Sequence, residues 1–427
     1  MILIYSSTSS KRLQYICQFI FREQLGITYS ITIDSEGFKN HDGPKINYSR
    51  DPICDDELCI KNESLLFEED IKLQPIDCFT LNGKIAFFKS ASGYPFDIFA
   101  ASFYLLSRYE EYLPHSEDMY GRYDHTNSLA SKKGFLGIPL VNIWILDFAN
   151  ELTKKIPSLE FNFPSFTYLP TYDIDIAFSY KHKGLLRNIG GFIKSPSIDR
   201  VKVLMRLEED PYDCYTFLDH LHAEADLKPI YFFLAATSPG KYDKNISPYS
   251  HPMWQLIKAH AKKYRTGLHP SWKSNENVSI IKKEKKIIES AGNISVIDSR
   301  QHYIRFSLPG TFTNLMEAGI RNDFSMGYGS INGFRASVAS PFFWFNLHTN
   351  QQTELRIHPF CFMDANSYYE QGFSPEQALV ELTGYYNVCK TVNGTCISIF
   401  HNHFLGNDKK FAGWKEMYSS FISRIRQ

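Results

Sequence analysis

From residue 166 to the end of the chain, short apolar segments typical of strands alternate with longer amphipathic segments typical of helices. KPIYFFLAA at 228–236 is an example of the first kind, and ENVSIIKKEKKIIESAG at 276–292 of the second. Because parallel strands need a crossover connection, repeated units of this sort predict a parallel sheet covered by helices. The pattern alone leaves two folds open, an α/β barrel and an open doubly wound sheet.

A shorter alternation of the same kind precedes this region. ILIY and ITYSITID read as strands, and the helix candidate between them has serines for an N-cap and Gly26 for its end. The polar, turn-rich stretch 114–139 reads as a long loop, and loops of that length commonly serve a site or an interface. We therefore expect three regions: a small α/β N-terminal domain at 1–120, a connector at 121–165 and the main domain at 166–427.

Composition excludes several function classes. Lysine plus arginine equals aspartate plus glutamate, 46 each, which gives no electrostatic case for nucleic acid or an anionic membrane. The longest apolar runs fall short of the roughly 20 residues that span a bilayer, and the start lacks a basic leader. We expect a cytoplasmic protein without nucleic-acid partners or stable membrane insertion. Its eight cysteines read as reduced thiols rather than a disulfide framework.

Polar side chains recur where the predicted strands of the main domain end. In a β/α barrel, active sites lie at this edge of the sheet, so these side chains are candidates for one site. A lone histidine at such a place is more often structural than a ligand, so only several such residues together indicate a site. Its members are Asp173 and Asp175 in YDID, His269 in GLHPSW, His302 in SRQHY, Arg335 in GFRAS and His401 in SIFHNH.

These residue types suit metal-assisted hydrolysis. A carboxylate and two imidazoles can hold a divalent ion with open positions for water. The ion polarises an acyl carbonyl and lowers the pKa of bound water. A second carboxylate, oriented by a neighbouring cation, can take the proton of that water, and a protonated histidine can donate to the leaving group.

Residues of about 166 to 405 resemble the polysaccharide deacetylase family. TYDID is similar to the family motif Thr-Phe-Asp-Asp with one residue inserted between the acids, and PIYFFLAA is similar to its second strand. GLHPSW, GFRAS and SIFHNH match the later motifs that supply a histidine, an arginine and a histidine. The whole chain resembles bacterial proteins that carry such a domain behind an uncharacterised N-terminal domain.

The resemblance implies a distorted seven-stranded β/α barrel that removes acetyl groups from a sugar, most simply an N-acetylhexosamine unit. Such a carbohydrate deacetylase is a hydrolase of non-peptide carbon–nitrogen bonds or of carboxylic esters. The implied roles are a general base for Asp173, metal ligands for Asp175 and His269, an orienting cation for Arg335 and a general acid for His401. The implied metal is divalent, with zinc as the first choice.

One position departs from the family. Where a further metal-binding histidine is expected, four residues after His269, the chain has Lys273, which cannot be a ligand while it is protonated. We expect His302 to take that place. Three further residues are candidates for contact with the sugar: Trp272, Tyr303 and His403.

Two other functions fit parts of this pattern. Glycosyltransferases use an acid-x-acid motif to hold a metal and a nucleotide sugar, but they have no need of the histidines and arginine at later strand ends. A pseudo-deacetylase, which binds carbohydrate or a protein partner without catalysis, would account for Lys273 and for the aromatic content of 15%.

Overall fold

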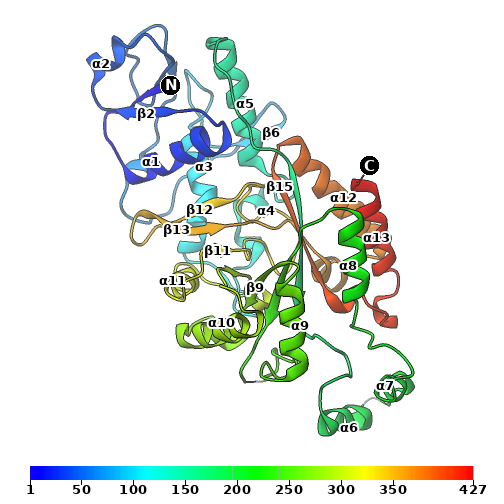
Figure 1. Cartoon of the computed structure of the whole chain (residues 1–427). Helices are drawn as coiled ribbons and strands as arrows, with labels where there is room; N and C mark the ends of the chain where they lie inside the picture. The colour runs from blue at the N-terminus through cyan, green and yellow to red at the C-terminus, as the bar shows by residue number, and fades with distance from the viewer. Residues whose placement is uncertain (195, 239, 427) are drawn as a thin grey trace.

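The computed structural model describes residues 1–194, 196–238 and 240–426, and a large sheet lies at its centre (Figure 1). Nine strands of the described residues form this sheet in the order β12-β13-β11-β10-β9-β8-β7-β15-β14. Their bounds are β7 Thr167–Ile174, β8 Ile230–Leu234, β9 Arg265–His269, β10 Asp298–Ser299, β11 Asn322–Asp323, β12 Phe342–Asn346, β13 Gln351–Ile357, β14 Phe362–Met363 and β15 Thr395–His401.

The predicted parallel, helix-covered sheet is confirmed. Every recorded pairing between neighbouring strands is parallel except that of β12 with β13, which are joined by a tight turn. Among the described residues the two end strands, β12 and β14, each pair with one neighbour. The sheet thus has more strands than the seven expected, because the antiparallel β12 and very short strands such as β11 join it.

Helices flank the sheet where the alternating pattern predicts them (Figure 1). Side chains of β7 alternate between its two faces, and Tyr172 points outward to hydrogen-bond His222 of α8 and Tyr418 of α13. The helices of this region are α8 Tyr215–Glu224, α9 His251–Ala261, α10 Val278–Gly292, α11 Gly310–Glu317, α12 Pro375–Thr391 and α13 Trp414–Ile425.

A second, four-stranded sheet forms the start of the chain, in the order β2-β1-β3-β4. Ser10 caps the first helix by accepting a hydrogen bond from the Leu13 amide, and Gly26 follows its end at a φ of +64°. The elements of this part are β1 Ile2–Tyr5, α1 Lys11–Cys17 and its π-helical continuation Gln18–Gln24, β2 Tyr29–Thr32, α2 Ser35–Lys39, β3 Lys45–Asn47, β4 Leu58–Cys59, and a hairpin of β5 Phe79–Leu81 and β6 Lys84–Ala86.

The apolar stretch of residues 95–113 forms an interrupted helix rather than a continuous one. α3 (Ile98–Leu106) ends where Arg108 takes a left-handed φ of 53°, and a short 3-10 turn, Tyr109–Tyr112, follows. The break lets Arg108 pair with Glu110 and Glu111 inside the protein, at 3.0 and 2.7 Å. Helices α4 (Leu129–Lys132) and α5 (Leu140–Lys155) follow, and one continuous apolar core extends through both sheets.

Two helices between β7 and α8 were not predicted. α6 (Leu185–Lys194) and α7 (Ile198–Leu204) project from the lower right of the molecule in Figure 1. Within the described residues, no helix has the length and apolar content needed to cross a membrane.

Candidate active site

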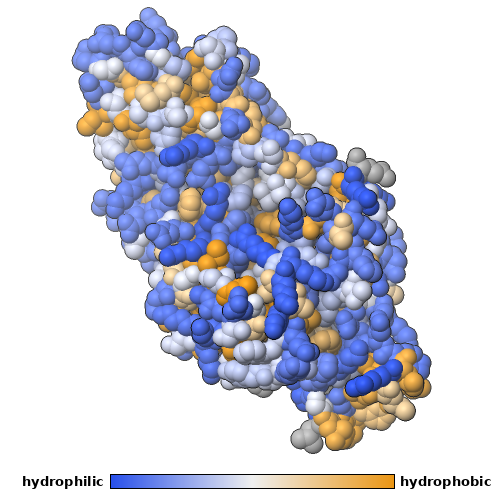
Figure 2. All heavy atoms as spheres, in the orientation of Figure 1, coloured by the Kyte–Doolittle hydropathy of each residue, from blue (hydrophilic) through white to orange (hydrophobic). Residues whose placement is uncertain are grey.

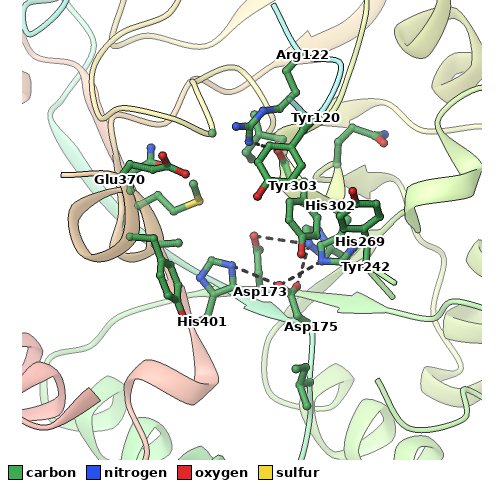
Figure 3. A pocket seen from close by; sticks show the side chains of 18 of the residues that line it. Tyr120, Arg122, Asp173, Asp175, Tyr242, His269, His302, Tyr303, Glu370 and His401 are labelled. Carbon is green, nitrogen blue, oxygen red and sulfur yellow. Dashed lines mark hydrogen bonds and ion pairs between the residues drawn. The ribbon is translucent and has the colours of Figure 1, made fainter. Parts of the chain in front are cut away.

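The two acids of YDID lie at the carboxyl end of β7 and face the same cavity. Alternation along the strand places Asp173 and Asp175 on one side and Tyr172 and Ile174 on the other. The register with β15 sets His401 directly beside Asp173. Figure 3 shows the acids between His401 on one side and His269 with His302 on the other. The cavity that they share has a volume of about 410 Å³, within the range of small-molecule sites.

Asp175, His269 and His302 form a group whose ligand atoms all lie within 4.8 Å of one another. His269 Nε2 is 3.1 Å from one carboxylate oxygen of Asp175, and His302 Nε2 is 3.3 Å from the other. His302 thus lies beside Asp175 and His269, and its role as a metal ligand stays a prediction. Lys273 lies exposed in the turn Trp272–Ser274, away from this group.

Hydrogen bonds on the far side of each ring fix which nitrogen faces Asp175. His269 Nδ1 lies 2.6 Å from the carbonyl oxygen of Arg300, so it carries the proton and donates it. His302 Nδ1 lies 3.1 Å from a carboxylate oxygen of Asp243 and donates likewise. Both Nε2 lone pairs are then free to point at a shared cation, as in protein metal sites whose histidines have such partners.

Electrostatics at this group favour a positive charge. Burial disfavours the imidazolium of His302, but the carboxylates of Asp175 and Asp243 outweigh burial and raise the pKa of His302 to about 9. Burial also disfavours an ionised Asp175, yet His302 and His401 outweigh it and hold the pKa of Asp175 well below its usual range. Either protons or a metal ion can supply this charge.

Arg300 is the cation that contacts Asp173. Its Nη1 donates to a carboxylate oxygen of Asp173 at 2.9 Å, and both side chains are fully buried. The Arg300 Nε donates to the Phe324 carbonyl at 3.1 Å, which fixes the guanidinium. The other oxygen of Asp173 faces His269 Nε2 at 4.0 Å and accepts no hydrogen bond from Arg300.

The expected pairing of Arg335 with Asp173 is therefore wrong. Arg335 binds Glu111 through two parallel hydrogen bonds of 2.8 and 2.6 Å and donates to the Gly327 carbonyl at 3.1 Å. The physical reason is that Glu111 is buried in the interrupted helix and needs counter-charges. Arg335 and Arg108 outweigh that burial and lower the pKa of Glu111 to about 2. Arg335 thus joins the N-terminal part to the main sheet.

His401 is held by a carboxylate from the neighbouring strand. Its Nδ1 lies 2.7 Å from Asp364 Oδ1, and its Nε2 faces Asp175 at 3.5 Å. Burial disfavours the imidazolium, but Asp364 and Asp175 outweigh it and raise the pKa of His401 to about 10. His403 also lines the cavity, and there burial lowers the imidazole pKa to about 3. The surroundings of the two rings thus favour the imidazolium form at His401 and the neutral imidazole at His403.

Aromatic side chains form one wall of the cavity. Tyr303 takes a left-handed φ of 60°, which is unusual for a bulky residue and turns its ring toward the rings of Tyr120 and Tyr242. Trp272 packs behind them, stacked on Tyr242 at 4.0 Å between ring centres. Of the three expected sugar-contact residues, Tyr303 and His403 line the cavity, whereas Trp272 supports its wall.

The long loop that precedes α5 also reaches the site. Tyr120 and Arg122 line the cavity opposite Glu370 (Figure 3). Asp118 holds the Arg122 guanidinium at 2.6 Å, and Arg122 Nη1 donates to the Tyr303 carbonyl at 2.7 Å. The loop thus reaches the cavity, although its sequence did not single out these two residues.

A separate group of potential ligands lies away from the cavity. The thiols of Cys361, Cys389 and Cys396 fall within 4.8 Å of one another in a small apolar cluster to which α12 contributes Cys389. All three are buried, as expected for reduced core thiols.

Comparisons with known proteins give one family model and several solved structures. Residues 2–157 match a family model described as a family of unknown function (DUF7033), and no curated protein matches the chain. Several solved structures are similar to about 60% of the chain. A probable polysaccharide deacetylase from Pseudomonas aeruginosa PAO1 is 10% identical, with a TM-score of 0.39, and the match covers 61% of this chain and 84% of that one.

Two further structures are similar to a comparable share of the chain. A CE4 family pseudoenzyme from Bacillus anthracis is 9% identical, with a TM-score of 0.33 and coverage of 61% of each chain. A polysaccharide deacetylase from Bacillus cereus is 10% identical, with a TM-score of 0.30 and coverage of 61% of this chain and 88% of that one. These TM-scores lie below 0.5, and the likeness by itself assigns no function to this chain.

Proposed function

We propose that the protein is a metal-dependent hydrolase that removes an acetyl group from an acetylated sugar. The observation that carries the proposal is the arrangement around Asp175. Two imidazole Nε2 atoms face this carboxylate, a second carboxylate with a buried arginine lies beside it, and a histidine held by Asp364 lies opposite. A glycosyltransferase or a pure binding protein has no use for a histidine held in this way, His401 with Asp364.

The donor set fits a divalent ion. Asp175, His269 and His302 would hold it, because both histidines already donate their Nδ1 protons to fixed acceptors. A divalent ion bound there supplies a Lewis acid that polarises an acyl carbonyl and lowers the pKa of water. Zinc is the first ion to test, since one carboxylate and two imidazoles are common zinc ligands.

Proton transfers in this scheme belong to two side chains. The oxygen of Asp173 that faces His269 accepts the proton of the attacking water, while Arg300 orients the carboxylate through its other oxygen. His401 keeps its proton because Asp364 and Asp175 raise its pKa, and it donates that proton to the leaving amine or alcohol.

The aromatic wall suits a sugar ring as substrate. Tyr120, Tyr242 and Tyr303 offer flat apolar faces beside the acids, and Arg122 and Glu370 offer polar groups at the rim. A cavity of about 410 Å³ accepts one or two sugar units rather than a long polymer segment. We therefore propose an N-acetylhexosamine unit of an oligosaccharide, or of a polysaccharide precursor, as the substrate class.

Release of acetate tests the proposal. Protein stripped with a chelator should be inactive on N-acetylated chito-oligosaccharides and should regain activity when zinc is added. Asp173→Asn should bind zinc as the wild type does and should lose at least about 100-fold in kcat, since a general base contributes that much or more. Full activity in the chelated protein or in Asp173→Asn would refute the assignment.

A further inference from the structure

The segment between β7 and α8 builds an arm with an unpaired apolar face. α6 carries Leu185, Ile189, Phe192 and Ile193 at helical spacing on one side. α7 continues this surface, and nine of the 18 exposed large apolar side chains of the described residues lie within 185–207. They are Leu185, Ile189, Phe192, Ile193, Ile198, Val201, Leu204, Met205 and Leu207. Figure 2 shows them as a patch at the lower right, over the projecting helices.

The exposure at the arm is large for side chains of this type. Leu185, Ile193 and Ile198 are 75%, 76% and 74% exposed, whereas chemically similar residues elsewhere form the core. Contiguous apolar patches on a protein surface mark places that bind a partner or a membrane.

Charge identifies the kind of partner. Residues 181–207 contain seven lysines or arginines and one aspartate, a net charge of +6, in a chain whose total is zero. Glu208, just outside, pairs with Lys202 at 2.6 Å. The balance of the whole chain therefore conceals a strongly basic segment. Basic and apolar residues combined on short helices are typical of segments that lie in the headgroup region of anionic membranes.

The base of the arm is anchored firmly, while none of the residues that the structure describes covers its apolar surface. Asp210 accepts hydrogen bonds from the amides of Ser179, Tyr180 and Lys181 at 2.6 to 2.9 Å, which joins the two ends of the arm. Arg187, on the polar side of α6, donates to the Lys244 carbonyl at 3.1 Å. Lys244 itself lines the catalytic cavity, so the arm begins at the rim of the site.

From these observations we propose that the arm of residues 181–207 binds reversibly to the surface of an anionic lipid bilayer. The apolar faces of α6 and α7 enter the interface, and the basic side chains contact lipid phosphates. This binding differs from a membrane span, for which the described residues have no suitable helix. It holds whatever reaction the site performs, because no residue of the arm takes part in the proposed chemistry.

Co-sedimentation with vesicles tests the proposal directly. The full chain should bind vesicles of phosphatidylcholine with phosphatidylglycerol, and it should bind phosphatidylcholine alone much more weakly. Added salt should weaken the binding, because screening shortens the reach of the basic side chains. The triple variant Leu185→Gln/Ile193→Gln/Ile198→Gln should lose about tenfold or more in the bound-to-free ratio, since it removes apolar contact with the interface.

A matched control separates the arm from general surface hydrophobicity. Ile33→Gln/Leu73→Gln/Val380→Gln changes side chains that are 65%, 82% and 73% exposed elsewhere, and it should bind vesicles as the wild type does. Hydrogen–deuterium exchange of the unmodified chain provides a readout that depends on no variant. Anionic vesicles should protect 185–204 and leave the cavity-lining segments unchanged.

Three results would overturn the proposal. The first is a wild type that does not sediment with anionic vesicles, and the second is an arm variant that binds as tightly as the control. The third is a protein that ignores vesicles but forms dimers which the arm variant abolishes in light scattering. That last result would identify a second copy of the chain as the occupant of the apolar face.

Discussion

Replacing Arg300 with methionine should break the buried ion pair with Asp173 and so impair catalysis. A matched change at Arg335 breaks an equally buried ion pair that lies away from the cavity acids. Arg300 donates to Asp173 at 2.9 Å and to the Phe324 carbonyl at 3.1 Å, and no part of it is exposed. Methionine keeps apolar volume but removes the charge and both hydrogen bonds. Asp173 is then left as a buried carboxylate without its cation.

The loss of stability in this variant follows from the burial of the ion pair. Removal of one partner of a buried ion pair typically destabilises a protein by about 3–5 kcal/mol. That is a large part of the roughly 5–15 kcal/mol that stabilises a typical folded protein, so the variant is best studied at low temperature. Folded Arg300→Met should also lose about 100-fold or more in kcat, because Asp173 is no longer oriented as a base.

Arg335→Met is the matched control. It breaks the bidentate pair with Glu111, which retains Arg108 at 2.7 Å, so it should destabilise the protein by a similar or smaller amount. Activity per folded molecule should stay near that of the wild type, because Arg335 does not contact the cavity acids. Urea unfolding followed by circular dichroism gives the free energies of unfolding, and acetate release gives the rates. An inactive folded Arg335→Met, or a fully active Arg300→Met, would refute this division of roles.

Three further changes probe other parts of the account. His302→Ala should lower zinc affinity by at least about tenfold in a competition titration, while His403→Ala should leave it unchanged; equal affinities would remove His302 from the ligand set. Tyr120→Ala should raise KM for an acetylated oligosaccharide by about tenfold, the loss of ~1.4 kcal/mol of contact, and should spare a small acetyl ester. An equal rise in KM for both substrates would contradict a role of Tyr120 in contact with the sugar. Burial raises the pKa of Glu284 from 4.5 to about 7. As the pH rises, the unfolded chain therefore loses the proton of this carboxyl group at a lower pH than the folded chain does. The wild type should therefore lose up to about 3 kcal/mol of stability relative to Glu284→Gln as pH rises from 4.5 to 7, and a flat difference would exclude the raised pKa.

Much of the site could be predicted because strand ends meet at one edge of a parallel sheet. YDID placed two acids on one face of a strand, and GLHPSW, SRQHY and SIFHNH placed histidines at the ends of neighbouring strands. The position of His302 beside His269 and Asp175 followed from the same adjacency. Such predictions need only the order of strands and the alternation of side chains.

The partner of Asp173 could not be predicted in this way. Arg300 and Arg335 both follow short strands or turns, so either could have been the partner of Asp173. Glu111, which lies far away in the chain, binds Arg335 and leaves Arg300 as the partner. A buried carboxylate in the first domain thus decides which arginine is free for the site. Arg300, two residues before His302, repeats the spacing of the acids in YDID, and this was the signal available in the sequence.

The arm and the contribution of Tyr120 to the aromatic wall were missed for different reasons. The apolar spacing at 185–193 is that of an amphipathic helix, but the neutral total charge of the chain conceals the basic residues around it. Tyr120 lies in a polar loop without periodicity, and only the folded contacts with Tyr303 and Trp272 identify its role.

Anomalous scattering from a crystal of the zinc-loaded protein tests the central claim most directly. The account predicts one peak in the cavity, bonded to Asp175, His269 and His302, with Asp173 beside it and hydrogen-bonded to Arg300. A cavity without a peak, or a fully ligated metal that leaves His302 out of its coordination shell, would contradict it.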